Sequence, residues 1–210
     1  MFVERDKMKK GGPRTLLSGV GINDATYSTR CRLSCGKVVT CPYYTRWASM
    51  LSRCYSKSYQ SSRPSYVGCT VAKEWHTFSV FRDWMKGQRW KGKSLDKDLI
   101  VPDNREYGPD TCIFVDSSVN SLLVNSDFSN SSQGVRVSAQ GKYNARVMKD
   151  GKVSHVGNYE TEEEAIYEYN LAKANHIRDV AARYFDPALF KALTQHARVY
   201  EEVASRIAVI

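Results

Sequence analysis

Residues 134–159 read GVRVSAQGKYNARVMKDGKVSHVGNY, and they decide the fold of the C-terminal half of the chain. The stretch contains three short runs that are typical of β-strands, namely GVRVS, KYNARVMK and KVSHVGNY. The turn AQG separates the first two runs, and the dipeptide DG, a strong signal for a tight hairpin, separates the last two. The stretch therefore predicts a three-stranded antiparallel sheet.

Helices are predicted directly after this sheet. Thr161 and Glu164 have the three-residue spacing of a capping box, and the acidic residues between them suit the first turn of a helix. The predicted helix lies across the back of the sheet. Asp186 followed by Pro187 then starts a second helix, with Asp as the cap and Pro at the first helical position. We expect this last helix to pack on its own domain.

The predicted sheet is basic, whereas the start of the first helix is acidic. Residues 134–155 contain one acid, Asp150, and five basic residues, which are Arg136, Lys142, Arg146, Lys149 and Lys152. A narrow sheet fits into the major groove of DNA, where Arg reads guanine and other side chains bind phosphate. Alternate residues of a strand share a face, so Arg136 and Ser138 can share one, as can Asn144, Arg146 and Met148.

Residues 133 to about 178 resemble the APETALA, or ethylene-response-factor, type of DNA-binding domain. The resemblance rests on the G-V-R start, the K-aromatic-x-A strand, the G-x-aromatic turn and the T-x-E-E-A start of the helix. Such domains also occur in phage and mobile-element homing endonucleases. The resemblance implies that residues on the sheet contact bases and phosphates. The candidate DNA-binding residues are Arg136, Lys142, Asn144, Arg146, Lys149, Lys152 and His155.

This chain departs from the family at most of the reading positions. Arg136 matches a reading arginine, whereas Ser138 and Met148 occupy other arginine positions. Arg146 stands at a glutamate position and His155 at a tryptophan position. The resemblance therefore implies a base preference different from that of the plant proteins.

Two helices are predicted upstream of the sheet. In residues 43–55, apolar side chains recur at three- and four-residue spacing, which is one face of a helix. In residues 73–85, aromatic side chains recur every three residues and predict a second buried helical face, with His76 on the helix surface. Residues 58–66 are expected to form a loop, from their composition.

Residues 94–123, SLDKDLIVPDNREYGPDTCIFVDSSVNSLL, predict a strand, a loop containing Pro and Asn, a short apolar strand and the start of a helix. This order resembles the ββα-metal, or His-Me finger, unit of His-Asn-His nucleases. With the segments YYTRWASMLSRCY and GCTVAKEW upstream, residues 42 to about 180 are similar to phage proteins described as His-Asn-His endonucleases.

The nuclease resemblance implies a role for five residues. Asp96 and Asn120 take the positions that bind a divalent metal such as Mg²⁺. Lys97 takes the position of the base, and Thr111 takes that of the residue that orients it. Asp98 is an additional metal ligand or a substitute base.

The stretch lacks the histidine that such a site uses as its base. A lysine near its reference pKa of about 10.4 is a poor base at neutral pH unless burial lowers that pKa strongly. An aspartate near its reference pKa of about 3.9 is ionised but weakly basic. Two functions stay open: a metal-dependent homing-type endonuclease, and a DNA-binding regulator whose nuclease unit keeps its fold without chemistry. A module directed at RNA or protein is disfavoured, because the sheet suits a duplex groove.

Composition supports a polyanionic partner. The 210 residues carry a formal charge of +9, and residues 1–60 hold eleven Lys or Arg against three Asp or Glu. A solubility bias would give the same charge, so charge alone does not decide. The six cysteines lack zinc-ribbon spacing, and Cys54, Cys69 and Cys112 suit a buried environment. No apolar run is long enough to cross a membrane, and the N-terminal residues show no signal-peptide pattern.

The predicted fold is α+β, with a helical and ββα-metal nuclease unit followed by a three-stranded antiparallel sheet plus helix. The predicted ranges are a basic arm at 1–41, the nuclease unit at 42–125, a linker at 126–132, the DNA-binding domain at 133–185 and a C-terminal helix at 186–210. The predicted partner is double-stranded DNA, and the resemblance to phage proteins implies the cytoplasm of an infected bacterial cell.

Overall fold

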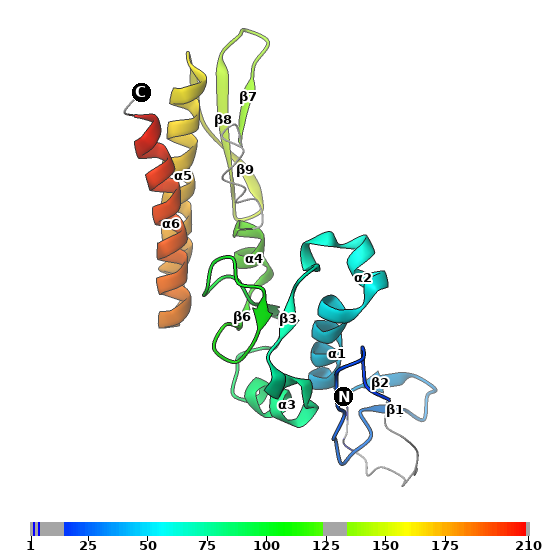
Figure 1. Cartoon of the computed structure of the whole chain (residues 1–210). Helices are drawn as coiled ribbons and strands as arrows, with labels where there is room; N and C mark the ends of the chain where they lie inside the picture. Colours follow the sequence, from blue (N-terminus) through cyan, green and yellow to red (C-terminus); the bar gives the residue numbers. More distant parts are fainter. Residues whose placement is uncertain (1, 3, 5–14, 124–133, 209–210) are drawn as a thin grey trace. The chain divides into compact units, whose positions relative to one another are not determined.

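The computed structural model describes residues 2, 4, 15–123 and 134–208, and the chain divides into two compact units (Figure 1). The first unit is Met1–Phe114 and the second is Val115–Ile210. Helices alternate with small sheets, which confirms a mixed α+β fold. The predicted linker at 126–132 lies outside the described residues, and the division falls earlier in the chain than the predicted end of the nuclease unit at residue 125.

The first unit is built from short elements. In chain order they are β1 (Arg30–Arg32), β2 (Val38–Thr40), α1 (Pro42–Tyr55), α2 (Lys57–Ser62), η1 (Pro64–Tyr66), β3 (Thr70–Val71), η2 (Lys73–His76), α3 (Phe78–Lys86), β4 (Ser94–Asp96), β5 (Glu106–Tyr107) and β6 (Ile113–Val115), which reaches the division between the units. The strands pair as β1 with β2, β3 with β5, and β4 with β6.

Aromatic side chains form the core of the first unit. The predicted helix over 43–55 is α1, and its buried face is Trp47, Met50, Leu51 and Cys54. The indole Nε1 of Trp47 donates to the backbone carbonyl of Trp75 at 2.7 Å, so the buried N–H is satisfied. The Trp75 ring in turn lies 4.5 Å from the Trp84 ring and 5.0 Å from the Phe81 ring, centroid to centroid.

Residues 73–85 differ from the single helix that their spacing predicts. The structure has a 3₁₀ turn, η2, then an extended Thr77, and then α3. The three-residue repeat of aromatic residues suits a 3₁₀ turn as well as an α-helix, which explains the difference. His76, predicted on a helix surface, is half-buried, and its Nε2 lies 3.0 Å from the carbonyl oxygen of Val71.

Part of the predicted basic arm belongs to this core. Ala25, Tyr27 and Cys41 are buried, and Ile22 pairs with Thr77 through its backbone. Asp24 accepts hydrogen bonds from the backbone N–H and the hydroxyl of Ser79, at 2.9 and 2.5 Å, in the first turn of α3. Residues 15–41 contain few apolar side chains, spread among glycine and basic residues, so their sequence shows no periodic pattern. These few side chains nevertheless attach the segment to the core of the unit.

Residues 58–66 were expected to form a loop from their Ser, Gln and Pro content, but they form α2 and η1. Ser56 caps α2 by accepting the N–H of Tyr59 at 3.4 Å, and Gln60 donates to the carbonyl of Cys54 at 2.7 Å. Such local side-chain bonds, rather than an apolar face, stabilise this segment.

The second unit contains α4 (Ser117–Leu123), β7 (Val135–Val137), β8 (Tyr143–Lys149), β9 (Lys152–Tyr159), α5 (Glu162–Ala181) and α6 (Pro187–Ile207). β7, β8 and β9 form the predicted three-stranded antiparallel sheet, in that order. The DG turn joins β8 to β9, with positive φ angles of 48° at Asp150 and 79° at Gly151, as a tight hairpin requires.

α5 packs between the sheet and α6 (Figure 1). The predicted cap is present, since the Thr161 hydroxyl accepts the N–H of Glu164 at 3.2 Å. α6 begins as predicted at Asp186, whose carboxylate accepts the N–H groups of Ala188 and Leu189. It packs along α5 and buries Leu189, Ala192, Leu193, Ala197, Tyr200 and Ala204. None of the helices in the described part of the chain is long and apolar enough to cross a membrane.

Candidate nucleic-acid interface and Asp96 loop

One side of the β7–β9 sheet faces away from α5. Val135, Ala145 and Val147 are buried on the α5 side. Because side chains alternate along a strand, their neighbours project from the opposite side, which we call the outer face. The strand register adds the residues that lie directly opposite these neighbours on the adjacent strand. The outer face therefore consists of Arg136, Asn144, Arg146, Met148, Val153, His155 and Asn158.

A β-bulge brings His155 and Asn158 to the same face, although they are three positions apart in the sequence. The register pairs Ala145 with Gly157 but Arg146 with His155, so Val156 is the extra residue of β9. A regular strand would place residues 155 and 158 on opposite faces. The bulge therefore builds one row from Arg136, Asn144 and Asn158, and the next row from Arg146 and His155.

Asn144 connects these two rows. Its Nδ2 donates to Oδ1 of Asn158 at 2.6 Å and lies 3.2 Å from Nδ1 of His155. An amide nitrogen can only donate, so in a hydrogen bond between these two atoms Nδ1 of His155 is the acceptor. The Oδ1 atom of Asn144 accepts from Nε of Arg146 at 2.5 Å. The amide thus fixes the guanidinium through one edge.

The two terminal nitrogens of Arg146 are available to a ligand. Among the described residues, the guanidinium donates one hydrogen bond, from Nε to Asn144, and neither Nη atom donates a hydrogen bond. The side chain is exposed on the outer face, as is that of Arg136. A planar guanidinium with two free donors matches the paired acceptors of guanine in the major groove, or two oxygens of a phosphate.

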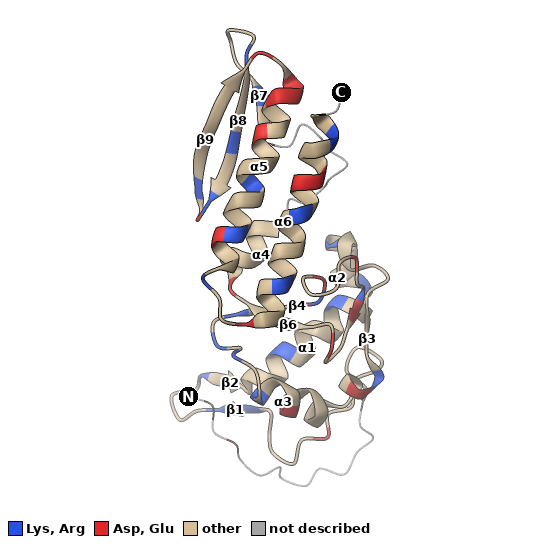
Figure 2. Ribbon diagram, turned by 90° about the vertical axis from the view of Figure 1, so that its left-hand side faces the viewer, with Lys and Arg blue, Asp and Glu red and all other residues tan. Residues whose placement is uncertain are grey.

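The remaining basic candidates lie elsewhere on the sheet. Lys142 pairs with Glu160 at 2.5 Å, so its charge is locally compensated. Lys149 and Lys152 pair with each other across the hairpin, in the register of the buried side of the sheet. The pKa of His176 of α5 is lowered mainly by burial, and Lys149 is one of the nearby positive charges that add to this effect. Figure 2 shows basic residues on β8 and β9 and acidic residues at the start of α5, as predicted.

Ser138 lies just beyond β7, in the turn to β8. Its hydroxyl accepts the N–H of Lys142 at 3.1 Å and so stabilises that turn. Of the seven predicted DNA-binding residues, the outer face brings together four: Arg136, Asn144, Arg146 and His155.

In the first unit, Asp96 ends β4 and is largely enclosed. Its Oδ1 accepts the backbone N–H of Leu99 at 2.8 Å and that of Asp98 at 3.1 Å, which holds the following turn. Burial and, second, the neighbouring charge of Asp98 together raise the pKa of Asp96 to about 6. A carboxyl with such a pKa can exchange a proton near neutral pH.

Lys97 is held by two oxygen acceptors. Its Nζ lies 3.0 Å from Oδ2 of Asp98 and donates to the carbonyl of Asn104 at 2.9 Å. The side chain is 11% exposed, whereas that of Asp98 is 53% exposed. Both contacts engage N–H groups of Lys97 with protein oxygens, so the geometry does not favour Lys97 as a base.

Asn104 organises the loop between β4 and β5. Its Nδ2 donates to the carbonyls of Lys97 and Glu106 at 2.7 and 2.6 Å, and its Oδ1 accepts the N–H of Glu106. Thr111, expected to orient the base, instead donates to the carbonyl of Glu106 at 2.8 Å and accepts the N–H of Gly108. Asn104 is therefore the residue in contact with Lys97, and the sequence interpretation missed it.

Four of the six cysteines of this unit are buried, whereas Cys31 is half-buried and Cys35 is exposed. Cys54, Cys69 and Cys112 are buried, as predicted, and burial raises the pKa of Cys54 and of Cys112 to about 12. Thiols with such pKa values are poor nucleophiles at neutral pH. Cys41 is also buried, and its sulfur lies 3.4 Å from the hydroxyl of Tyr27.

The residues of the Asp96 loop, which we define as 96–105 from the end of β4 to the start of β5, do not fit a metal ion in this conformation. Asp98 already binds the Lys97 ammonium, and one oxygen of Asp96 accepts two backbone N–H groups. Across residues 15–123 and 134–208, no three His, Cys, Asp or Glu side chains are grouped so that they could hold a metal. Asn120, the other predicted ligand, lies on α4 in the second unit, where its N–H donates to the carbonyl of Asp116 at 3.1 Å. The described residues therefore support no metal-dependent reaction step.

No protein-family model matches this chain, and neither the curated proteins nor the solved structures contain a match to it. The resemblances to APETALA-type domains and to His-Asn-His nucleases accordingly stay predictions that rest on the quoted motifs.

Proposed function

We propose that this protein binds double-stranded DNA through the outer face of β7–β9. The observation that carries the proposal is the preassembled Arg146–Asn144–Asn158 arrangement on an exposed, basic sheet. Because the guanidinium is held before a ligand arrives, less conformational entropy is lost when the base contact forms. The basic composition of the chain supports association with a polyanion.

Binding is tested by measuring duplex affinity against salt concentration, with charge-reversed variants. Arg136→Glu and Arg146→Glu each place a negative charge on the outer face. Each is expected to weaken binding roughly tenfold or more, and to reduce the slope of log K against log salt by about one. Lys191→Glu makes the same charge change on the exposed side of α6 and is the matched control. Affinity that does not change with salt, or equal losses in all three variants, would count against the proposal.

A second candidate function is a homing-type endonuclease dependent on Mg²⁺ or another divalent metal, for which the nuclease resemblance alone implies Asp96, Asp98 and Asn120 as ligands. One observation favours it: β4, a loop, β6 and α4 follow one another in the order that the nuclease resemblance implies. The arrangement of Lys97 favours the alternative, a nuclease-derived regulator without chemistry, because its ammonium occupies the Asp98 carboxylate. A phage protein of either kind would act in the cytoplasm of the infected cell.

Plasmid nicking with Mg²⁺ or Mn²⁺ separates these two functions. Wild type is compared with Asp96→Ala and Asn120→Ala, and with Asp103→Asn, at an exposed loop aspartate, as the control. Cleavage that both substitutions abolish and the control retains would support the nuclease. Cleavage that survives both would remove the site assignment, and no cleavage of any duplex that the protein binds would favour the regulator.

A further inference from the structure

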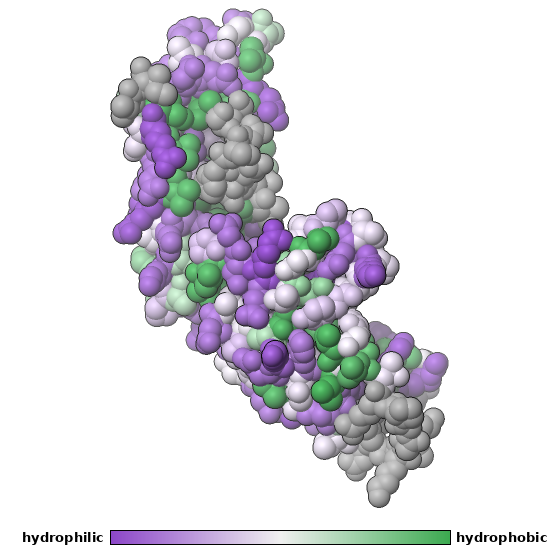
Figure 3. Space-filling view, in the orientation of Figure 1, coloured by the Kyte–Doolittle hydropathy of each residue, from purple (hydrophilic) through white to green (hydrophobic). Residues whose placement is uncertain are grey.

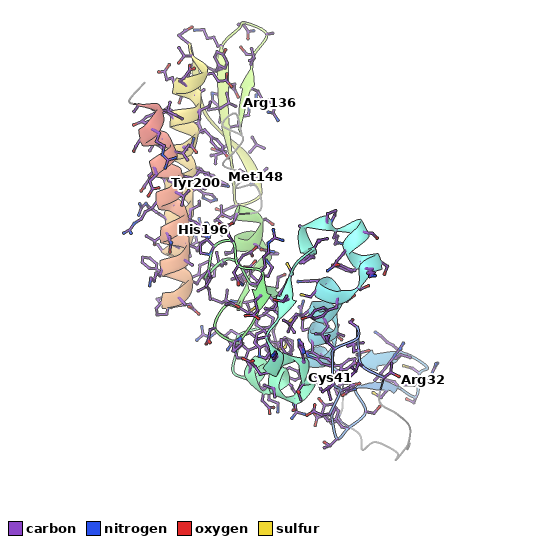
Figure 4. All side chains as sticks on the ribbon, viewed as in Figure 1. Arg32, Cys41, Arg136, Met148, His196 and Tyr200 are labelled. Carbon is purple, nitrogen blue, oxygen red and sulfur yellow. The ribbon has the colours of Figure 1, made fainter. Side chains whose placement is uncertain are left out.

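The outer face carries two large apolar side chains that are not buried in the core of the unit. Met148 and Val153 stand opposite each other on β8 and β9, with 51% and 63% of their surface exposed. Beneath them on the same hairpin, Val147 is buried against the rest of the unit. Figure 3 shows apolar patches within the hydrophilic surface of the chain, and Figure 4 labels Met148 and Arg136 on the sheet, with Tyr200 on α6.

The position of this pair relative to the charged residues points to its partner. The Met148–Val153 row follows the Arg146–His155 row along the same strands. A ligand that satisfies the arginine donors therefore also meets an apolar surface one row away. The 5-methyl group of thymine is the apolar group that a major groove presents beside the acceptors of guanine and adenine.

We propose that Met148 and Val153 contact thymine methyl groups and select T-containing sites, an inference that rests on the proposed DNA binding. Two residues along a strand span about 6.6 Å, which is close to two base-pair steps of about 3.4 Å each. A hairpin lying along the groove thus places the methyl contacts about two base pairs from the base pair that Arg146 meets. Burying each methyl is expected to improve affinity roughly fourfold, as about 0.8 kcal/mol per CH₂ implies.

The test uses duplexes in which uracil replaces thymine, since the two bases differ only in the methyl group. Sites are first selected from a randomised duplex library, and each selected duplex is then synthesised with T and with U. Wild type is expected to bind the T form about fourfold to sixteenfold more tightly, for one or two methyl contacts. The variant Met148→Gln/Val153→Asn keeps side chains of similar size without a terminal methyl group, and it is expected to bind both forms equally, with an unchanged salt slope.

Two controls keep the outcomes distinct. Arg146→Ala is expected to weaken binding while leaving the ratio of T to U affinity near the wild-type value. Val137→Thr changes another exposed valine of the sheet and is expected to leave that ratio unaltered. Thermal unfolding of each variant shows that the fold persists.

Failure of this inference differs from failure of the proposed function. If wild type binds neither form at low salt, DNA binding itself is wrong. If it binds both forms equally, or if the double variant still prefers T, DNA binding stands and the methyl contact is wrong. A dimer in sedimentation experiments that the double variant abolishes would assign Met148 and Val153 to self-association and would also overturn the inference.

Discussion

Arg146 donates its Nε–H to Oδ1 of Asn144 across 2.5 Å, and the same amide donates to Asn158 at 2.6 Å. The position of the guanidinium therefore depends on a residue that contributes no charge. In the proposed DNA complex, Asn144 would act on the duplex through Arg146, as a positioning residue.

A double-mutant cycle measures this dependence. Asn144→Ala removes the acceptor that fixes Arg146, so we expect a loss of about threefold to tenfold in affinity for a selected duplex, on the order of 1 kcal/mol. Arg146→Ala is expected to weaken binding less in the Asn144→Ala background than in the wild type. Fluorescence anisotropy titrations of the four proteins give the coupling energy. Additive losses would show that Asn144 does not position Arg146.

Gly134 is predicted to be essential for the sheet. Its φ is +81°, and a Cβ there would overlap the Tyr169 ring and approach the carbonyl oxygen of Arg146. Gly134→Ala combines backbone strain with a steric clash, so we expect it to destabilise the second unit by roughly 3 kcal/mol or more. Gly141→Ala is the matched control, since its φ is +79° with no atom within 4 Å of the added Cβ, and strain alone should cost about 1 kcal/mol. Urea unfolding gives both values, and equal losses would contradict the clash.

The sheet and its two helices were predictable because local signals agreed there. The DG turn, the Thr161 cap and the Asp186-Pro187 start each fix a boundary, and the structure has all three. Local signals failed over 15–41, where attachment depends on a few contacts with residues far along the chain, such as that of Asp24 with Ser79. Such contacts leave no periodic pattern in the sequence.

The outer face was predictable only up to the bulge at Val156. The alternation of side chains along β8 placed Arg146 and Met148 on one face. The bulge shifts this alternation by one residue along β9, so the sequence could not assign Asn158 to that face. In the other unit, PDN at 102–104 signals a turn, yet the bond between Asn104 and Lys97 depends on how that turn closes. Site residues on regular strands were therefore easier to predict than those that depend on bulges and loops.

Gly21 tests whether the N-terminal residues belong to the first unit. A Cβ at Gly21 would overlap Leu51 and approach Trp47, both on the buried face of α1. Gly21→Ala is expected to lower the free energy of unfolding by about 1–3 kcal/mol, as for other overpacked cores. Gly87→Ala is the control, because its added Cβ would meet only the Trp84 carbonyl oxygen at 3.5 Å, an ordinary contact. Tryptophan fluorescence follows unfolding, and a neutral Gly21→Ala would contradict the packing of this segment.

Asp96 makes the stability of the first unit depend on pH. Its pKa is about 6 in the folded protein, against an ordinary value of 3.8, because burial and then the charge of Asp98 disfavour the carboxylate. The folded state therefore holds a proton that the unfolded state releases between these values. This contribution to stability is fully present below pH about 4 and is lost as the pH rises through about 6.

Asp96→Asn removes that charge while keeping an Oδ1 atom that accepts the N–H groups of Asp98 and Leu99. We expect the variant to be more stable than wild type at pH 7.5 by about 1–3 kcal/mol, with little difference at pH 4, since the wild-type carboxyl is then protonated as well. Urea unfolding at both pH values measures the two differences. Asp103→Asn is the control, because Asp103 is exposed and its φ of +59° is one that asparagine also adopts readily. A gain of the same size at both pH values would mean that the benefit does not come from the buried charge, and a loss at pH 7.5 would mean that the Asp96 carboxylate stabilises the loop.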